Sequence, residues 1–201
     1  FTPELCQEAL DIIARYDHGP LFSPPTLRGV INMPGGLGGS DWVGAAAHPE
    51  KGWIYVPSHT LPMVIRLHPM DDPDAAQAPF WGPGEDRLDG PRGLPLTKPP
   101  YGRLTAIDLN TGEHVWMVPT GSGPVNHPAI RDLDLPPLGY RTRWFVLANS
   151  SLLFSACEYP YAFSASDPEY YFDPEAYFFA FDQESGREVA RVELPGNVYG
   201  N

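Results

Sequence analysis

The sequence predicts an all-β protein, a β-propeller of four-stranded antiparallel blades preceded by one short helix. Three observations predict this fold class. Short stretches of alternating polar and apolar residues recur along the chain, separated by turns rich in Gly, Asn and Pro. The 201 residues include 20 Gly and 25 Pro beside 12% aromatic residues, which is typical of a loop-rich β protein. One motif, Ala-x-Asp-x-x-(Thr/Ser)-Gly, occurs twice, at 106–112 and at 180–186.

The first expected element is a helix over residues 3–16, PELCQEALDIIARY. Thr2 stands where its hydroxyl can cap the first turn. The apolar residues fall near one face at helical spacing: Leu5, Ala9, Ile12, Ile13 and Tyr16. We expect residues 1–18 to form an N-terminal helical segment and residues 19–201 to form the propeller part.

The expected strands follow one single strand at 28–34 and fall into two groups of four. The first group is 43–48, 53–58, 103–108 and 113–118, and the second is 143–149, 151–156, 176–182 and 187–193. In each group the longest connection joins the second and third strands. Repeated four-stranded units are the signature of propeller blades, although a two-sheet sandwich also contains regular short strands. The motif recurs at the same place in both groups, which favours the propeller.

The chain carries about two full blades plus parts of their neighbours. Propellers need about four to eight blades to close a ring. We therefore expect the chain to be either a fragment or a subunit whose ring is completed by another chain.

Composition and charge exclude some classes of function. The formal net charge is −12 and the pI is about 4.7, so the surface repels nucleic-acid phosphates. No apolar run approaches the roughly 18 residues of a membrane span. Cys6 and Cys157 lie in neither a haem-attachment nor a zinc motif. We expect two unpaired thiols, with a disulfide as the alternative in an oxidising compartment.

The first copy of the repeat, AIDLNTGEHVW at 106–116, resembles the tryptophan-docking motif of the quinoprotein dehydrogenases at every fixed position. In that family the Trp of one blade packs against the motif of the next blade. The second copy, AFDQESGREVA, has Ala190 where the Trp would stand. We therefore expect the junction after the second blade to be weaker or filled differently.

The resemblance extends over most of residues 19–195. The segments 19–58 and 93–128 look like the pyrroloquinoline-quinone (PQQ) dehydrogenases of the membrane-type glucose dehydrogenase group, in the later blades of the propeller. The resemblance implies a periplasmic enzyme, attached to the membrane through a segment outside this chain, that oxidises a sugar, polyol or alcohol hydroxyl. It implies PQQ with a divalent cation, usually calcium, and electron transfer to ubiquinone or a cytochrome.

The family's site residues carry over at a few positions. A lysine or arginine hydrogen-bonds the quinone oxygens, and Lys98 in LPLTKPP is the corresponding residue. Its register is one residue off from the best-known members, where Thr97 would align. Trp42 in GGSDWVG corresponds to a tryptophan near PQQ, and Asp41 stands beside it. The plainer alternatives are a surface lysine and a packed aromatic side chain.

The resemblance also implies a carboxylate that accepts the substrate hydroxyl proton. In the membrane glucose enzymes it lies in the insertion before the lysine, and here Asp86 and Asp89 are closest to that position. The alternative is a pair of solvated loop carboxylates. The resemblance places most metal ligands on earlier blades, so no metal ligand is assigned to this chain.

Two other functions stay open. A non-catalytic propeller would keep the scaffold as an interaction platform without a quinone site. A carbohydrate-binding module would use the aromatic loops EYPYAF and PEYYFDPEAYFF to stack on sugars. Lys98 and the long insertion favour the dehydrogenase, because a scaffold needs neither.

Overall fold

The computed structural model describes residues 1–36, 38–40, 44–70, 80–81, 85–157 and 177–195. The chain divides into two compact units. The insertion unit comprises Phe1–Gly38 and Leu61–Thr97, and the blade unit comprises Gly39–Thr60 and Lys98–Asn201. The expected division between residues 1–18 and 19–201 stays a prediction.

The N-terminal helix forms as predicted but ends earlier. Helix α1 spans Pro3–Ile13, and the Thr2 hydroxyl accepts a hydrogen bond from the backbone N–H of Leu5 at 3.3 Å. Beyond Ile13 the backbone bonds tighten to a spacing of three residues, which closes the helix before Tyr16. No described helix is both long enough and apolar enough to cross a membrane.

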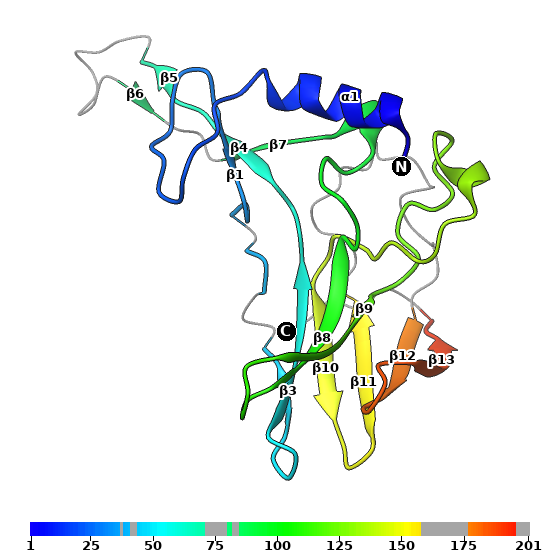
Figure 1. Ribbon diagram of the computed structural model, residues 1–201. Helices are drawn as coiled ribbons and strands as arrows, with labels where there is room; N and C mark the ends of the chain where they lie inside the picture. Colours follow the sequence, from blue (N-terminus) through cyan, green and yellow to red (C-terminus); the bar gives the residue numbers. More distant parts are fainter. Residues whose placement is uncertain (37, 41–43, 71–79, 82–84, 158–176, 196–201) are drawn as a thin grey trace. The chain divides into compact units, whose positions relative to one another are not determined.

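The insertion unit contains short strands that the sequence pattern does not reveal. Strands β1 (Val30–Asn32), β4 (Met63–Ile65) and β7 (Glu85–Arg87) form an antiparallel sheet in the order β1-β4-β7 (Figure 1). Strands β5 (His68–Pro69) and β6 (Phe80–Trp81) pair with each other, and a short 3₁₀ turn covers Pro91–Gly93. The expected strand at 28–34 is confirmed as β1. Strands of two or three residues are too short to show alternation, which is why the pattern predicts none of the others.

The blade unit contains the two predicted blades, each with its strands in chain order and antiparallel (Figure 1). The first blade consists of β2 (Ala46–His48), β3 (Trp53–His59), β8 (Gly102–Asp108) and β9 (His114–Pro119). The second consists of β10 (Trp144–Ala148), β11 (Leu152–Cys157), β12 (Tyr177–Asp182) and β13 (Glu188–Glu193).

The two blades share one apolar core. Strand β10 lies against β2 and β3, so one face of each sheet is covered by the other sheet. The buried core side chains come from both blades: Ala46, Tyr55, Leu104, Ala106, Trp144, Leu153, Phe179 and Phe181. This is face-to-face packing of neighbouring blades, with large aromatic residues filling the interface.

Antiparallel pairing sends successive connections to opposite ends of the blades. The turn end carries the four short connections, 49–52, 109–113, 149–151 and 183–187. The loop end carries the long ones: the chain leaves the blade unit after Thr60, returns at Lys98, and later crosses from blade to blade through 120–143. That crossing contains a 3₁₀ turn at Arg131–Leu133. Long loops held by a rigid scaffold are where binding residues usually lie.

The two cysteines are unpaired thiols, as expected. Cys6 is exposed on α1, whereas Cys157 ends β11. Burial raises the pKa of the Cys157 thiol to about 11, so at neutral pH it is a neutral packing group rather than a nucleophile.

Candidate functional site

The repeated motif forms the same turn in both blades. In the first blade the Asp108 carboxylate accepts hydrogen bonds from the backbone and side-chain N–H groups of Asn110, at 2.8 and 2.9 Å. The Thr111 hydroxyl accepts from the N–H of Glu113. Gly112 closes the turn at a φ of 79°, a left-handed conformation that favours glycine. Asp108, Thr111 and Gly112 of the motif therefore each have a role in the turn.

The second copy forms the same backbone turn, but its aspartate is bonded by the serine that replaces threonine and not by the residue two positions on. The Asp182 carboxylate accepts from the Ser185 hydroxyl at 2.6 Å and from its N–H at 2.9 Å. Gly186 has a φ of 68°. The strand register also shifts just after Ala106 and just after Ala180, so the two copies share a bulge as well as a turn.

These bonds to Asp182 predict an acid-sensitive turn. The Ser185 hydrogen bonds, helped by Arg187 and Lys51, hold the pKa of Asp182 below its ordinary 3.8. A group with a lowered folded pKa stabilises the protein above its unfolded pKa and loses that contribution as pH falls through the folded value. Thermal unfolding followed from about pH 6 to about pH 2 should show a smaller loss of Tm below pH 4 in D182N than in the wild type. Parallel curves for the two proteins would contradict the prediction.

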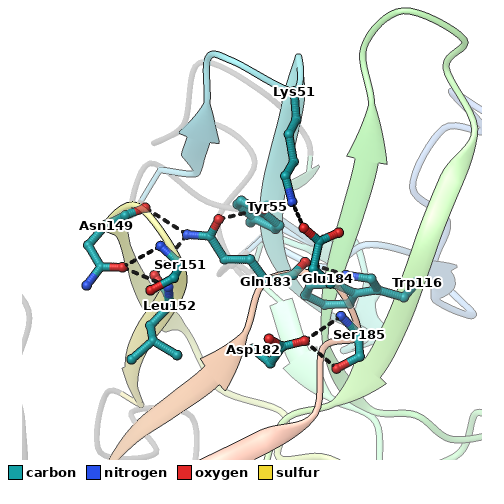
Figure 2. Close-up of polar contacts among 10 residues, drawn as sticks. All are labelled: Lys51, Tyr55, Trp116, Asn149, Ser151, Leu152, Asp182, Gln183, Glu184 and Ser185. Carbon is teal, nitrogen blue, oxygen red and sulfur yellow. Dashed lines mark hydrogen bonds and ion pairs between the residues drawn. The ribbon is translucent and has the colours of Figure 1, made fainter.

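Trp116 joins the first blade to the turn of the second (Figure 2). Its indole Nε1–H donates to the backbone carbonyl of Gln183 at 2.9 Å. Its ring lies over Gly186, where a Cβ added to the glycine would come within 2.6 Å of the ring. The Trp116 ring also stacks on the Tyr55 ring, and the two ring centroids are 5.8 Å apart. The predicted docking of the motif Trp onto the next blade is confirmed.

Gln183 also contributes buried hydrogen bonds to the junction between the blades. Its side chain is buried, and Nε2 donates to the carbonyls of Asn149 at 2.8 Å and Leu152 at 3.0 Å (Figure 2). The Tyr55 hydroxyl donates to its Oε1 at 3.3 Å. Burial, with Asp182 nearby, raises the pKa of Tyr55, so this hydroxyl stays protonated. Sequence reasoning missed Gln183 because it occupies a variable position of the motif.

An ion pair between Lys51 and Glu184 also spans the two blades (Figure 2). The Lys51 ammonium additionally lies over the Trp53 ring, 4.7 Å from its centroid. Glu184 is largely exposed, so the pair adds little to stability in water. Of these two contacts, the packing of Trp116 contributes more to holding the two blades together.

The two motif glycines allow a matched test of this docking. Gly186→Ala places a methyl group against the Trp116 ring and strains a left-handed backbone. Gly112→Ala imposes similar backbone strain, but nothing lies within 4 Å of the added carbon. We expect G112A to cost about 1 kcal/mol of unfolding free energy and G186A about 1–3 kcal/mol more. Guanidinium unfolding measures both; equal losses would show that Trp116 does not press on Gly186.

At the loop end, the segment before β8 is held by two other parts of the chain, the residue just after β3 and the crossing 120–143. The Thr60 N–H donates to the Tyr101 carbonyl at 2.8 Å, and the Tyr101 N–H donates to the Leu138 carbonyl at 2.7 Å. Tyr101 is fully buried. A Cβ on Gly102 would overlap the Tyr140 carbonyl oxygen, so the two backbones approach closely there. The chain therefore re-enters the blade unit through a tightly held segment.

Lys98 is the first residue of that re-entry, and its side chain is exposed. The hydroxyl of the preceding Thr97 is buried without a hydrogen-bond partner among the described residues. The exposed ammonium group of Lys98, with its three donors, suits a ligand that presents carbonyl oxygens. This donor set fits a quinone, although the sequence-predicted role of Lys98 stays a prediction.

The other predicted site residues are distributed differently. Asp86 lies on β7 and Asp89 just beyond it, both exposed and both in the insertion unit. Asp89 accepts a hydrogen bond from the Nε of Arg87 at 2.6 Å. Asp41 and Trp42 lie outside the described residues, as do the aromatic loops, except that Tyr177, Phe178 and Phe179 of the second loop lie on β12. The roles of all four residues stay predictions.

A metal site is not found in the part of the chain that the structure describes. No group of three or more His, Cys, Asp or Glu side chains there could hold a metal ion. The described residues therefore do not fit a calcium site, and we assign the cation no ligands here.

Comparison with known proteins places this geometry in a family. The β-propeller domain of the PQQ glucose/ethanol/alcohol dehydrogenases matches the chain over residues 1–201. The chain belongs to this family. The quinoprotein resemblance carried by the docking motif is thereby confirmed, together with the propeller fold.

Individual relatives in the family act on different substrates. A probable quinate dehydrogenase (quinone) from Xanthomonas campestris pv. juglandis is 28% identical over 198 residues, which cover 90% of this chain and 23% of that protein. The glycerol dehydrogenase large subunit from Gluconobacter thailandicus is 31% identical over 208 residues, covering 90% and 26%. The quinoprotein glucose dehydrogenase from Escherichia coli (strain K12) is 30% identical over 114 residues, covering 48% and 14%. The chain thus spans about a quarter of the length of the first two relatives.

Proposed function

We propose that this chain is part of a PQQ-dependent dehydrogenase that oxidises a sugar or alcohol hydroxyl and passes the electrons to a quinone or cytochrome. One observation carries the proposal. Trp116 of the quinoprotein docking motif joins the two blades, and Lys98 lies three residues before Tyr101, whose backbone is hydrogen-bonded to Thr60 and Leu138 at the loop end. The family match over the whole chain supports it.

PQQ, when bound, supplies a quinone that accepts two electrons from the substrate. Lys98 would hold it by donating hydrogen bonds from its ammonium group to quinone oxygens. The same donors would stabilise the negative charge that develops there during reaction.

Asp86 and Asp89 are the proposed acceptors of the substrate hydroxyl proton. Of the two, Asp86 is the stronger candidate, because one oxygen of Asp89 is already engaged by Arg87. We expect D86N to lower kcat by a factor of about 10² to 10⁴, whereas D89N should lower it less. Steady-state turnover with Tm measured alongside checks this. Full activity in D86N would remove Asp86 from the mechanism.

The proposal is tested by reconstituting the native assembly that contains this chain with PQQ and calcium. We expect uptake of the quinone chromophore and reduction of an artificial dye when glucose, glycerol or quinate is added. Magnesium in place of calcium tests which divalent cation the assembly prefers. An assembly that binds no quinone and reduces no dye would instead be a non-catalytic scaffold.

We place the assembly in the periplasm, attached to the membrane through a segment outside this chain, on the resemblance to the membrane-type glucose dehydrogenase group. The electron acceptor would then be ubiquinone or a separate cytochrome. Osmotic-shock fractionation with compartment markers tests the location. Ubiquinone reduction by isolated membranes tests the acceptor.

A further inference from the structure

We propose that Arg103 is a positioning residue that holds the Lys98 loop in place. Its Nη1 donates to the Thr60 hydroxyl at 2.7 Å and to the Pro100 carbonyl at 3.2 Å. The guanidinium therefore bridges the residue just after β3 and the segment that precedes β8. The inference rests on the proposed function only in giving Lys98 a quinone to face.

The sequence of the Lys98 loop explains why a side chain is needed to hold it. Lys98 is followed by Pro99 and Pro100, which have no backbone N–H to donate. Backbone hydrogen bonds can therefore hold these two prolines only through their carbonyls. Arg103 binds the Pro100 carbonyl, and the next residue, Tyr101, is fixed by backbone bonds to Thr60 and Leu138. Only Pro99 and Pro100 lie between Lys98 and the hydrogen-bonded backbone of Tyr101.

The geometry of the guanidinium suits this task. Arg103 is half-buried and comes second in β8, where its pair on β3 is Ser58. Its planar group holds charge-assisted hydrogen bonds in a fixed direction, which a lysine ammonium does not do. A lysine at 103 would keep the charge but lose the fixed direction of its bonds. Arg103 thus acts on the quinone through Lys98 and not by contact.

The first arm of the test needs no cofactor. In the native assembly, T60V removes the hydroxyl acceptor with almost no change of shape, and R103M removes the donors. Hydrogen exchange at the Tyr101 amide should accelerate about tenfold in each variant, the factor expected for losing a hydrogen bond from a charged donor. Amides of β11 and β12 should exchange at the wild-type rate. The proposed role of Arg103 is overturned if the exchange rate at Tyr101 is unchanged. It is also overturned if amide exchange accelerates equally throughout both blades.

The second arm measures PQQ affinity by fluorescence quenching, with and without K98A. If Arg103 only positions Lys98, T60V and R103M should each raise the Kd for PQQ about tenfold when Lys98 is present. In the K98A background each should raise it less than twofold. An R103M effect that persists in K98A shows direct contact with the quinone and overturns the proposal. A wild-type assembly that binds no PQQ refutes the proposed function, while the exchange arm still decides the proposed role of Arg103.

Discussion

Replacing Trp116 by alanine is expected to lower the free energy of unfolding by about 3 kcal/mol, the lower end of the range for a large aromatic core residue, because Trp116 is partly buried against the core. The side chain joins the blades through one hydrogen bond to Gln183, a ring contact with Gly186 and a stack on Tyr55. Its removal takes away these contacts at the edge of the core that the two blades share. Guanidinium unfolding followed by near-ultraviolet circular dichroism measures the loss.

W116F separates the two parts of this contribution. Phenylalanine keeps most of the ring packing but cannot donate to the Gln183 carbonyl. We expect W116F to cost about 1–2 kcal/mol, close to the value of one buried hydrogen bond. V115A, at an exposed neighbouring position on β9, is the control for an ordinary substitution in this strand. A W116A protein as stable as V115A would mean that the junction is not held by Trp116.

Replacing Lys98 by alanine is expected to reduce turnover by a factor of about 10² to 10³, the usual effect of removing one preorganised donor to a developing negative charge. The Kd for PQQ should rise as well, since the same donors hold the oxidised quinone. Thermal stability should barely change, because the side chain is exposed. Turnover, PQQ titration and Tm on the same preparation measure the three effects.

Two variants serve as controls for Lys98. K98R keeps a positive charge with a different donor geometry and should retain part of the activity. K51A removes a lysine at the turn end of the blades, where it pairs with Glu184. K51A should leave turnover unchanged, so that a loss confined to K98A is not a general effect of charge. Wild-type turnover in K98A would show that another cation faces the quinone.

Strand positions in the blades were predictable because period-two alternation is a local property. All eight blade strands lie within a few residues of their expected ranges, from β2 to β13. The insertion was not predictable in the same way, since its strands contain only two or three residues. The end of α1 also moved from residue 16 to Ile13, because frayed last turns carry no clear sequence signal.

Among the site residues, the sequence identifies those that belong to a motif. Trp116 is assigned by its spacing and docks on the next blade's motif as expected, where it meets Gly186, while Asp182 shapes the turn of that motif. Lys98 is assigned by resemblance, and the structure adds that its loop is anchored. Arg103 carries no such signal, because an arginine within a strand pattern is most simply an exposed side chain.

The sequence by itself determined the two blades, the turns that end them and the residue that joins them, because each depends on a short repeated pattern of residue types. Only the tertiary structure decided what Gln183 and Arg103 do. Gln183 bonds to a tyrosine 128 residues away, and Arg103 bonds to a threonine 43 residues away. Such bonds depend on how long connections close upon the sheets, and no local pattern encodes the partner of a side chain that far along the chain.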